Sequence, residues 1–149
     1  MKRIVVIAGA LLFSVSAVVA QQEVAVQQQN QMKDQGKYMY GVVLKMVKGD
    51  TPFDQAAAEG ALKALGESVA KIPTVFTTNP KQDVVNATYG SSQKIWQTKS
   101  DFDAKVPPVA KAIADAKGTF KDPATLKVTF DAVQEKCNGC HDDYRVKLK

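Results

Sequence analysis

Apolar residues recur at spacings of three and four in four segments of the chain, which is the spacing of one face of an α-helix. The segments cover about residues 23–48, 51–72, 100–116 and 122–144. The stripes are Met32, Gly36, Met39, Val43 and Met46; Phe53, Ala57, Ala61, Leu62, Leu65, Val69 and Ile72; Phe102, Val106, Val109, Ala110, Ile113 and Ala116; and Leu126, Phe130, Val133, Cys137, Cys140 and Tyr144. The pattern predicts an all-α protein, an antiparallel four-helix bundle.

Helix-start signals accompany three of these segments. Thr51-Pro52 and Asp122-Pro123 each combine a capping residue with a proline at the first helical position, where its missing N–H is not needed. Ser100, with Asp103 three residues later, resembles a capping box. These signals predict helices that begin at or just after each cap.

Other residues predict where helices end or bend. Gly49-Asp50 ends the first helix and Pro73 ends the second. Residues 73–92 predict a long irregular crossing, a type of loop that often frames a site. Pro107-Pro108 lies inside the third apolar stripe and predicts a kink or a late helix start. The alanine-rich second helix is expected to leave room for a bound group.

The first twenty residues resemble a secretory signal peptide, with Lys2 and Arg3 before a long apolar run. A membrane anchor is the alternative, because the run could almost span a bilayer. With cleavage after Ala20, the mature chain is a single domain of residues 21–149, periplasmic and not membrane-bound. Without Lys2 and Arg3 the net charge falls from +5 to +3. The charges are scattered, which argues against nucleic-acid binding.

The stretch CNGCHDDYR, residues 137–145, holds both cysteines and the only histidine of the chain. A disulfide between Cys137 and Cys140 would close a very short loop and constrain little. A zinc site needs a fourth strong ligand, and a thioredoxin-like pair needs a βαβ setting. Cys-x-x-Cys-His is the attachment motif of c-type haem, in which the thiols bond covalently and His141 binds the iron. We therefore expect one covalent haem c, held between facing helices.

The chain resembles the class II c-type cytochromes, the cytochrome c′ family, over the whole of residues 21–149. The resemblance rests on the C-terminal motif followed by Tyr144-Arg145, on the Lys48–Asp54 segment KGDTPFD, and on Ile95-Trp96 followed by Phe102. It implies an antiparallel four-helix bundle, often dimeric through its first two helices. Gln28 stands where the family usually has an arginine, and Pro107-Pro108 is unusual.

The resemblance leaves two functions open. In one branch of the family a first-helix methionine is the second axial ligand, which makes the protein a low-spin electron carrier. The corresponding residue here is Met32; an ungapped alignment would place Lys33 there instead. In the other branch the iron is five-coordinate and binds nitric oxide or carbon monoxide. A second histidine is absent, which excludes bis-histidine ligation.

We expect one-electron transfer with His141 and Met32 as iron ligands and with a redox partner protein that the sequence does not identify. Arg145 lies one turn after His141, where it could contact the proximal side or a haem propionate, or simply form the solvated basic end of the helix. No acid–base or nucleophilic set of residues is visible, so we do not expect an enzyme.

Overall fold

The computed structural model describes residues 5–148, with side chains described from Val19 onward. The first helical segment is continuous: α1 (Val5–Gly36), the π-helix η1 (Lys37–Val43) and α2 (Leu44–Lys48). The second consists of α3 (Gln55–Val69) and the short α4 (Ile72–Val75). The third consists of α5 (Lys94–Gln97), α6 (Lys99–Ala104) and α7 (Val106–Asp115), and the fourth is α8 (Pro123–Tyr144).

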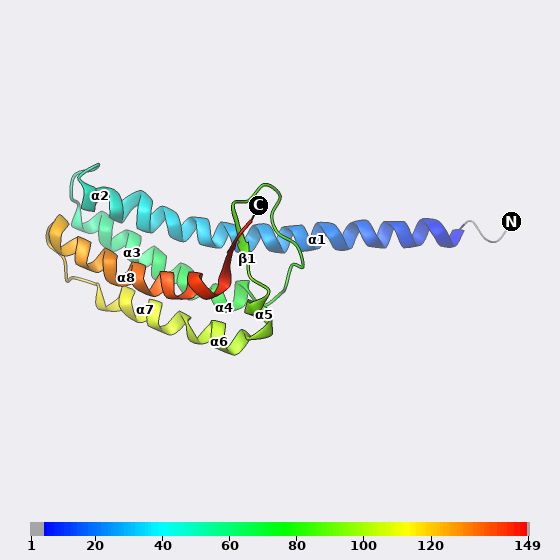
Figure 1. The fold of residues 1–149 in the computed structure, drawn as a ribbon. Helices are drawn as coiled ribbons and strands as arrows, with labels where there is room; N and C mark the ends of the chain where they lie inside the picture. The colour runs from blue at the N-terminus through cyan, green and yellow to red at the C-terminus, as the bar shows by residue number, and fades with distance from the viewer. Residues whose placement is uncertain (1–4, 149) are drawn as a thin grey trace.

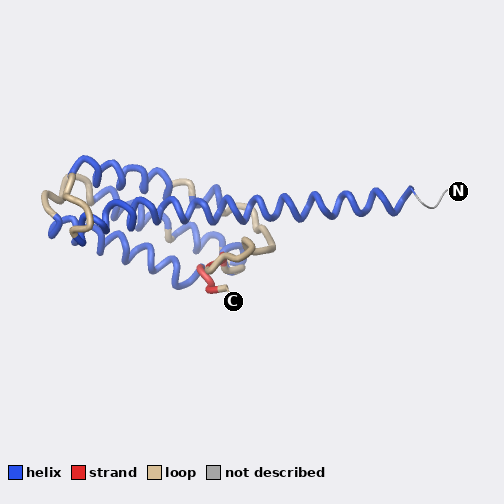
Figure 2. The backbone as a smooth tube through the Cα atoms, turned by 90° about the horizontal axis from the view of Figure 1, so that it is seen from above, coloured by secondary structure: helices blue, strands red, loops and turns tan. Residues whose placement is uncertain are grey.

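These four segments pack as the predicted antiparallel bundle. The first segment packs on α3, α3 packs on α7, α7 packs on α8, and α8 packs back on α2 and η1. Figure 1 shows successive segments running in opposite directions, and Figures 1 and 2 both show the N-terminal part of α1 extending well beyond the other helices. The fold class predicted from the apolar pattern is therefore confirmed.

The predicted apolar stripes form the core. Met39, Val43, Leu62, Phe102 and Leu126 are among the buried residues, and they belong to all four segments. Ala57 is an exception, because it is exposed and Ala58 is buried in its place. Ala58 lies seven residues before Leu65, or almost two full turns, whereas Ala57 lies about a quarter turn off that line.

Two of the predicted helix boundaries are confirmed and three are wrong. Pro73 does not end the second helix, because α3 already ends at Val69 and Pro73 lies in the first turn of α4. Asp122 caps α8 in a reciprocal capping box with Thr125, and Gly49, with φ of 79°, ends α2 in the left-handed conformation that glycine tolerates. Thr51 does not cap the second helix; Asp54 does, by accepting a hydrogen bond from Ala57 N–H. Ser100 is not a cap either, since α6 begins at Lys99.

The proline pair divides the third segment. α6 ends at Ala104 and α7 begins at Val106, so Pro107 and Pro108 lie in the first turn of α7. Backbone N–H groups in a first turn have no acceptor within their own helix, so proline causes no loss there. Lys105 is the junction residue between the two helices.

The irregular crossing predicted for residues 73–92 begins only at Phe76, because residues 73–75 belong to α4. A two-stranded antiparallel sheet ties it to the end of the chain: β1 (Tyr89–Ser91) pairs with β2 (Arg145–Lys147), with Gly90 opposite Val146. Strands of three residues are too short to leave an alternating pattern, so the sequence did not predict them. Figure 1 shows the crossing passing over α1 beside the C-terminus.

The predicted signal peptide lies partly outside the described residues, which exclude 1–4. Residues 5–20 form the first part of α1. Within residues 5–148, the structure has no helix with the combined length and apolar character needed to cross a membrane. Cleavage after Ala20 stays a prediction.

Candidate cofactor-binding site

The Cys-x-x-Cys-His motif occupies the last two turns of α8. Cys137, Cys140 and His141 are spaced three and one residues apart, which places them on one side of the helix. They continue the core stripe of Phe130 and Val133, but all three are only partly buried. The two thiols are free and are not joined by a disulfide. At this end of the bundle the stripe packs against the core on one side and lines a cavity on the other.

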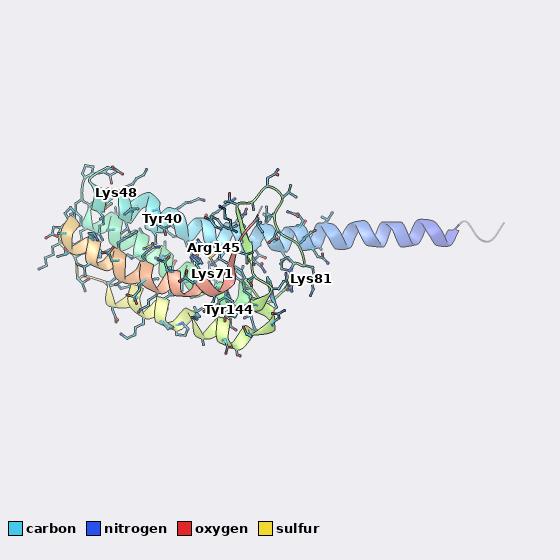
Figure 3. All side chains as sticks on the ribbon, in the orientation of Figure 1. Tyr40, Lys48, Lys71, Lys81, Tyr144 and Arg145 are labelled. Atoms are coloured by element: carbon cyan, nitrogen blue, oxygen red, sulfur yellow. The ribbon has the colours of Figure 1, made fainter. Side chains whose placement is uncertain are left out.

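The cavity has a volume of about 610 Å³ and is bounded by α1, the α3–α4 junction, the crossing, α6–α7 and α8. All five residues that the sequence singled out line it: Met32, Cys137, Cys140, His141 and Arg145. Figure 3 shows Tyr144 and Arg145 at the C-terminal end of α8, and both residues line the cavity. The structure thus brings together residues that are more than a hundred positions apart in the chain.

The cavity suits a large, mostly apolar cofactor. Its volume falls within the range of roughly 300–1,000 Å³ that is typical of cofactor sites. Apolar side chains such as Val69, Ile72, Trp96, Phe102 and Val109 form much of its wall. The alanine-rich part of α3 does not line it, contrary to expectation, because Ala58 and Ala61 are packed in the core below.

Two glutamine amides in the cavity wall carry buried atoms that lack a hydrogen-bond partner among the described residues. Gln28 donates from Nε2 to Thr78 O at 2.9 Å and to Val75 O at 3.3 Å, which leaves its Oε1 unpaired. Gln35 Nε2 is also unpaired. A buried polar group without a partner costs about 1–3 kcal/mol. Their place in the wall fits a cavity that is completed by a bound group with polar atoms of its own.

Burial sets the protonation state of the motif. It raises the pKa of the Cys137 thiol to about 11 and also raises the pKa of Cys140. The pKa of His141 is lowered, first by burial and then by the positive charge of Arg145. The imidazole is therefore neutral near pH 7, which is the form that binds a metal.

The first helix presents Met32, not Lys33, to the core. Met32 is partly buried and packs against the core cluster, whereas Lys33 is exposed, although both line the cavity. Gln28, Met32 and Gln35 follow one another at spacings of four and three, so the thioether lies between the two unpaired amides on one face of α1.

Arg145 ends α8 and begins β2. Its backbone N–H donates to His141 O, and its guanidinium lies 4.6 Å from the centre of the Tyr89 ring. The side chain is exposed and contacts the crossing. Its suggested role beside the iron or a propionate stays a prediction.

Tyr40 and Lys105 are among the residues of the cavity wall that sequence reasoning missed. The Tyr40 hydroxyl donates a hydrogen bond to Gln134 Oε1 at 2.8 Å, and the Tyr40 ring packs edge-to-face on Phe130. Lys105 reaches the motif from the α6–α7 junction. Only the proline pair after Lys105 pointed to that junction.

Comparison with known proteins agrees with this site. The family described as Cytochrome C′ matches residues 23–145. Cytochrome c-555 of Bradyrhizobium diazoefficiens is 54% identical over the full length of both chains, and cytochrome c-556 of Rhodopseudomonas palustris is 39% identical over 99% of each. The solved cytochrome c′ of Rhodopseudomonas palustris superposes with a TM-score of 0.73 at 33% identity, covering 85% of this chain and 98% of that one.

The chain belongs to the cytochrome c′ family. It is a c-type cytochrome that carries covalently attached haem c, as its single Cys-x-x-Cys-His motif and its cavity require.

Proposed function

We propose that this protein is a one-electron carrier in which His141 and Met32 would be the two protein ligands of the haem iron. The observation that carries the proposal is the position of Met32, which lines the same cavity as His141 and packs on the core while Lys33 is exposed. The match to relatives named cytochrome c-555 and c-556 supports the Met/His-ligated branch.

Each residue has a distinct part in this function. Cys137 and Cys140 hold the haem by thioether bonds, and the neutral His141 imidazole offers a nitrogen lone pair to the iron. When bound, the haem supplies an iron that gains and loses one electron. The Met32 thioether favours the ferrous state, and the apolar wall keeps water away from the centre.

A visible spectrum of the reduced protein, with and without carbon monoxide, tests the proposal. We expect a low-spin spectrum that carbon monoxide does not change. Met32→Leu should open the sixth position, so that the variant becomes high-spin and takes up carbon monoxide. Met39→Leu is the matched control, because Met39 lies on the same helical segment but is buried in the core.

Three results would contradict the proposal. Ready carbon monoxide uptake by the unmodified protein would favour the five-coordinate alternative, in which nitric oxide or carbon monoxide is the physiological ligand. The unpaired Gln35 N–H is the observation that favours it, because it could donate to a bound diatomic molecule. An unchanged spectrum in Met32→Leu would mean that Met32 only packs in the core and does not bind the iron. A changed spectrum in Lys33→Gln would mean that Lys33 is the ligand.

We also propose that the mature protein is periplasmic. The basic start and apolar run of residues 1–20 support export, and the mass of the purified holoprotein tests cleavage after Ala20. A homodimer through the first two helices, and the identity of the redox partner, stay predictions.

A further inference from the structure

Lys105 contacts the haem-attachment motif from another part of the bundle. Its Nζ lies 2.9 Å from Asp143 Oδ2 and donates to Gly139 O at 3.2 Å. Gly139 and Asp143 flank Cys140 and His141 in the chain. One cation therefore holds both sides of the segment that provides the second thioether and the axial imidazole.

The break between α6 and α7 places Lys105 there. A new helix starts at Val106, with Pro107 and Pro108 in its first turn, and Lys105 is the junction residue before it, with its side chain not used for capping. Its side chain is about two-fifths exposed and lines the cavity. The proline pair is thus tied to the placement of this cation.

The two members of the Lys105–Asp143 ion pair differ in their position relative to the cavity. Asp143 also pairs with Lys94 Nζ at 3.3 Å, so two lysines share one carboxylate. Lys105 is part of the cavity wall, whereas Asp143 is not. The cavity therefore faces the positive member of the Lys105–Asp143 pair.

We propose that Lys105 is a positioning residue that holds the motif and raises the reduction potential of the attached haem. Oxidation adds one positive charge at the iron, so a nearby cation disfavours the oxidised state and a nearby carboxylate favours it. Lys105 acts against oxidation, and Asp143 moderates that effect. The proposal rests on the covalent haem and not on Met32 as ligand, so it goes beyond the proposed electron carrier.

Redox titration of the holoprotein against an electrode at low ionic strength tests the charge effect. Lys105→Gln and Asp143→Asn break the same ion pair. We expect Lys105→Gln to lower, and Asp143→Asn to raise, the ratio of reduced to oxidised protein at a fixed potential. The change should be about two- to fivefold, the range for partly exposed charge pairs, and should shrink as salt is added.

The opposite signs separate an electrostatic role from a structural one. If the pair only held the fold together, both variants would shift the ratio in the same direction, and the proposal would be overturned. Lys111→Gln is the matched control, because Lys111 is on α7 in an exposed pair with Asp115 and does not line the cavity. A shift in this control as large as that in Lys105→Gln would also overturn the proposal.

Amide hydrogen exchange at the C-terminal turns of α8 tests the positioning effect. We expect Lys105→Gln to speed exchange there, and Lys105→Arg to restore both the exchange rate and the redox ratio, because arginine keeps the charge and the donors. If amide exchange in the C-terminal turns of α8 is unchanged in Lys105→Gln, Lys105 does not position the motif. Because the redox titration works equally on five-coordinate haem, failure of the Met32 proposal would leave this result interpretable.

Discussion

Tyr144 is the last residue of α8, three positions after His141, and we expect its ring to be a main support of the haem-binding end. It is almost fully buried, and its ring meets the Phe102 ring edge-to-face, with 5.1 Å between centroids and 88° between planes. Phe102 in turn lies 5.5 Å from the Phe76 ring. Truncating Tyr144 should therefore loosen the end of the motif, α6 and the start of the crossing together.

The expected cost of Tyr144→Ala is about 3–5 kcal/mol, the usual range for deleting a buried aromatic side chain. The contact with Phe102 should account for about 0.5–1.5 kcal/mol of this. A domain of this size has a total stability of about 5–15 kcal/mol, so the variant should remain folded but unfold at much lower denaturant concentration. Tyr144→Phe keeps the ring and its packing, and should therefore cost much less stability than Tyr144→Ala.

Guanidinium chloride unfolding of the holoprotein measures these values. Far-ultraviolet circular dichroism follows the helices. Fluorescence follows Trp96, the only tryptophan, which lines the cavity and should be quenched by a haem held there. A double-mutant cycle with Phe102→Leu isolates the ring–ring contribution. The reasoning fails if Tyr144→Ala costs less than about 1 kcal/mol, or if Tyr144→Phe is as harmful as Tyr144→Ala.

Two further predictions concern the crossing and the charges near the motif. A Cβ on Gly90 would collide with the Asp83 carboxylate, so Gly90→Ala should displace the crossing and speed hydrogen exchange at the β1–β2 amides. Unchanged protection would show that the side chain of Asp83 simply turns away. Hydrogen bonds from Lys105 and then from Lys94 hold the pKa of Asp143 below its usual value. The Asp143 carboxylate therefore stabilises the fold fully above the unfolded-state pKa of about 3.9. This stabilisation is lost as the pH falls through the lower pKa of the folded state. In urea unfolding, the difference between unmodified protein and Asp143→Asn should therefore be constant above about pH 5 and shrink below pH 4; a difference that grows on acidification would contradict this.

The sequence alone was sufficient for features that depend on neighbouring residues. Helical stripes, the cap at Asp122 and the stop at Gly49 arise from interactions within a turn or two, so the four segments and their order follow from local patterns. The haem motif is equally local, because both thiols and the imidazole lie within five residues of one helix. For that reason the cofactor was predicted before any fold was known.

Tertiary contacts decided the features that sequence patterns did not predict. The proline pair allowed a late helix start, which α7 confirms by beginning at Val106, but only the fold brings Lys105 to the haem motif. The β1–β2 pairing and the Arg145–Tyr89 contact join segments more than fifty residues apart. Short strands and single long-range contacts leave no periodic trace in a sequence, since their free energy comes from partners that only folding brings near.

The placement of Met32 shows where the two kinds of information meet. Its type and spacing made it a candidate, but sequence alignment alone left Lys33 as a competitor. The bundle places Met32 on the core-facing side of α1, beside Gln28 and Gln35, and leaves Lys33 exposed. The sequence determined which cofactor the protein binds, because attachment is local. The bundle decides what that cofactor faces, because only the folded protein brings α1 and α8 to the wall of one cavity.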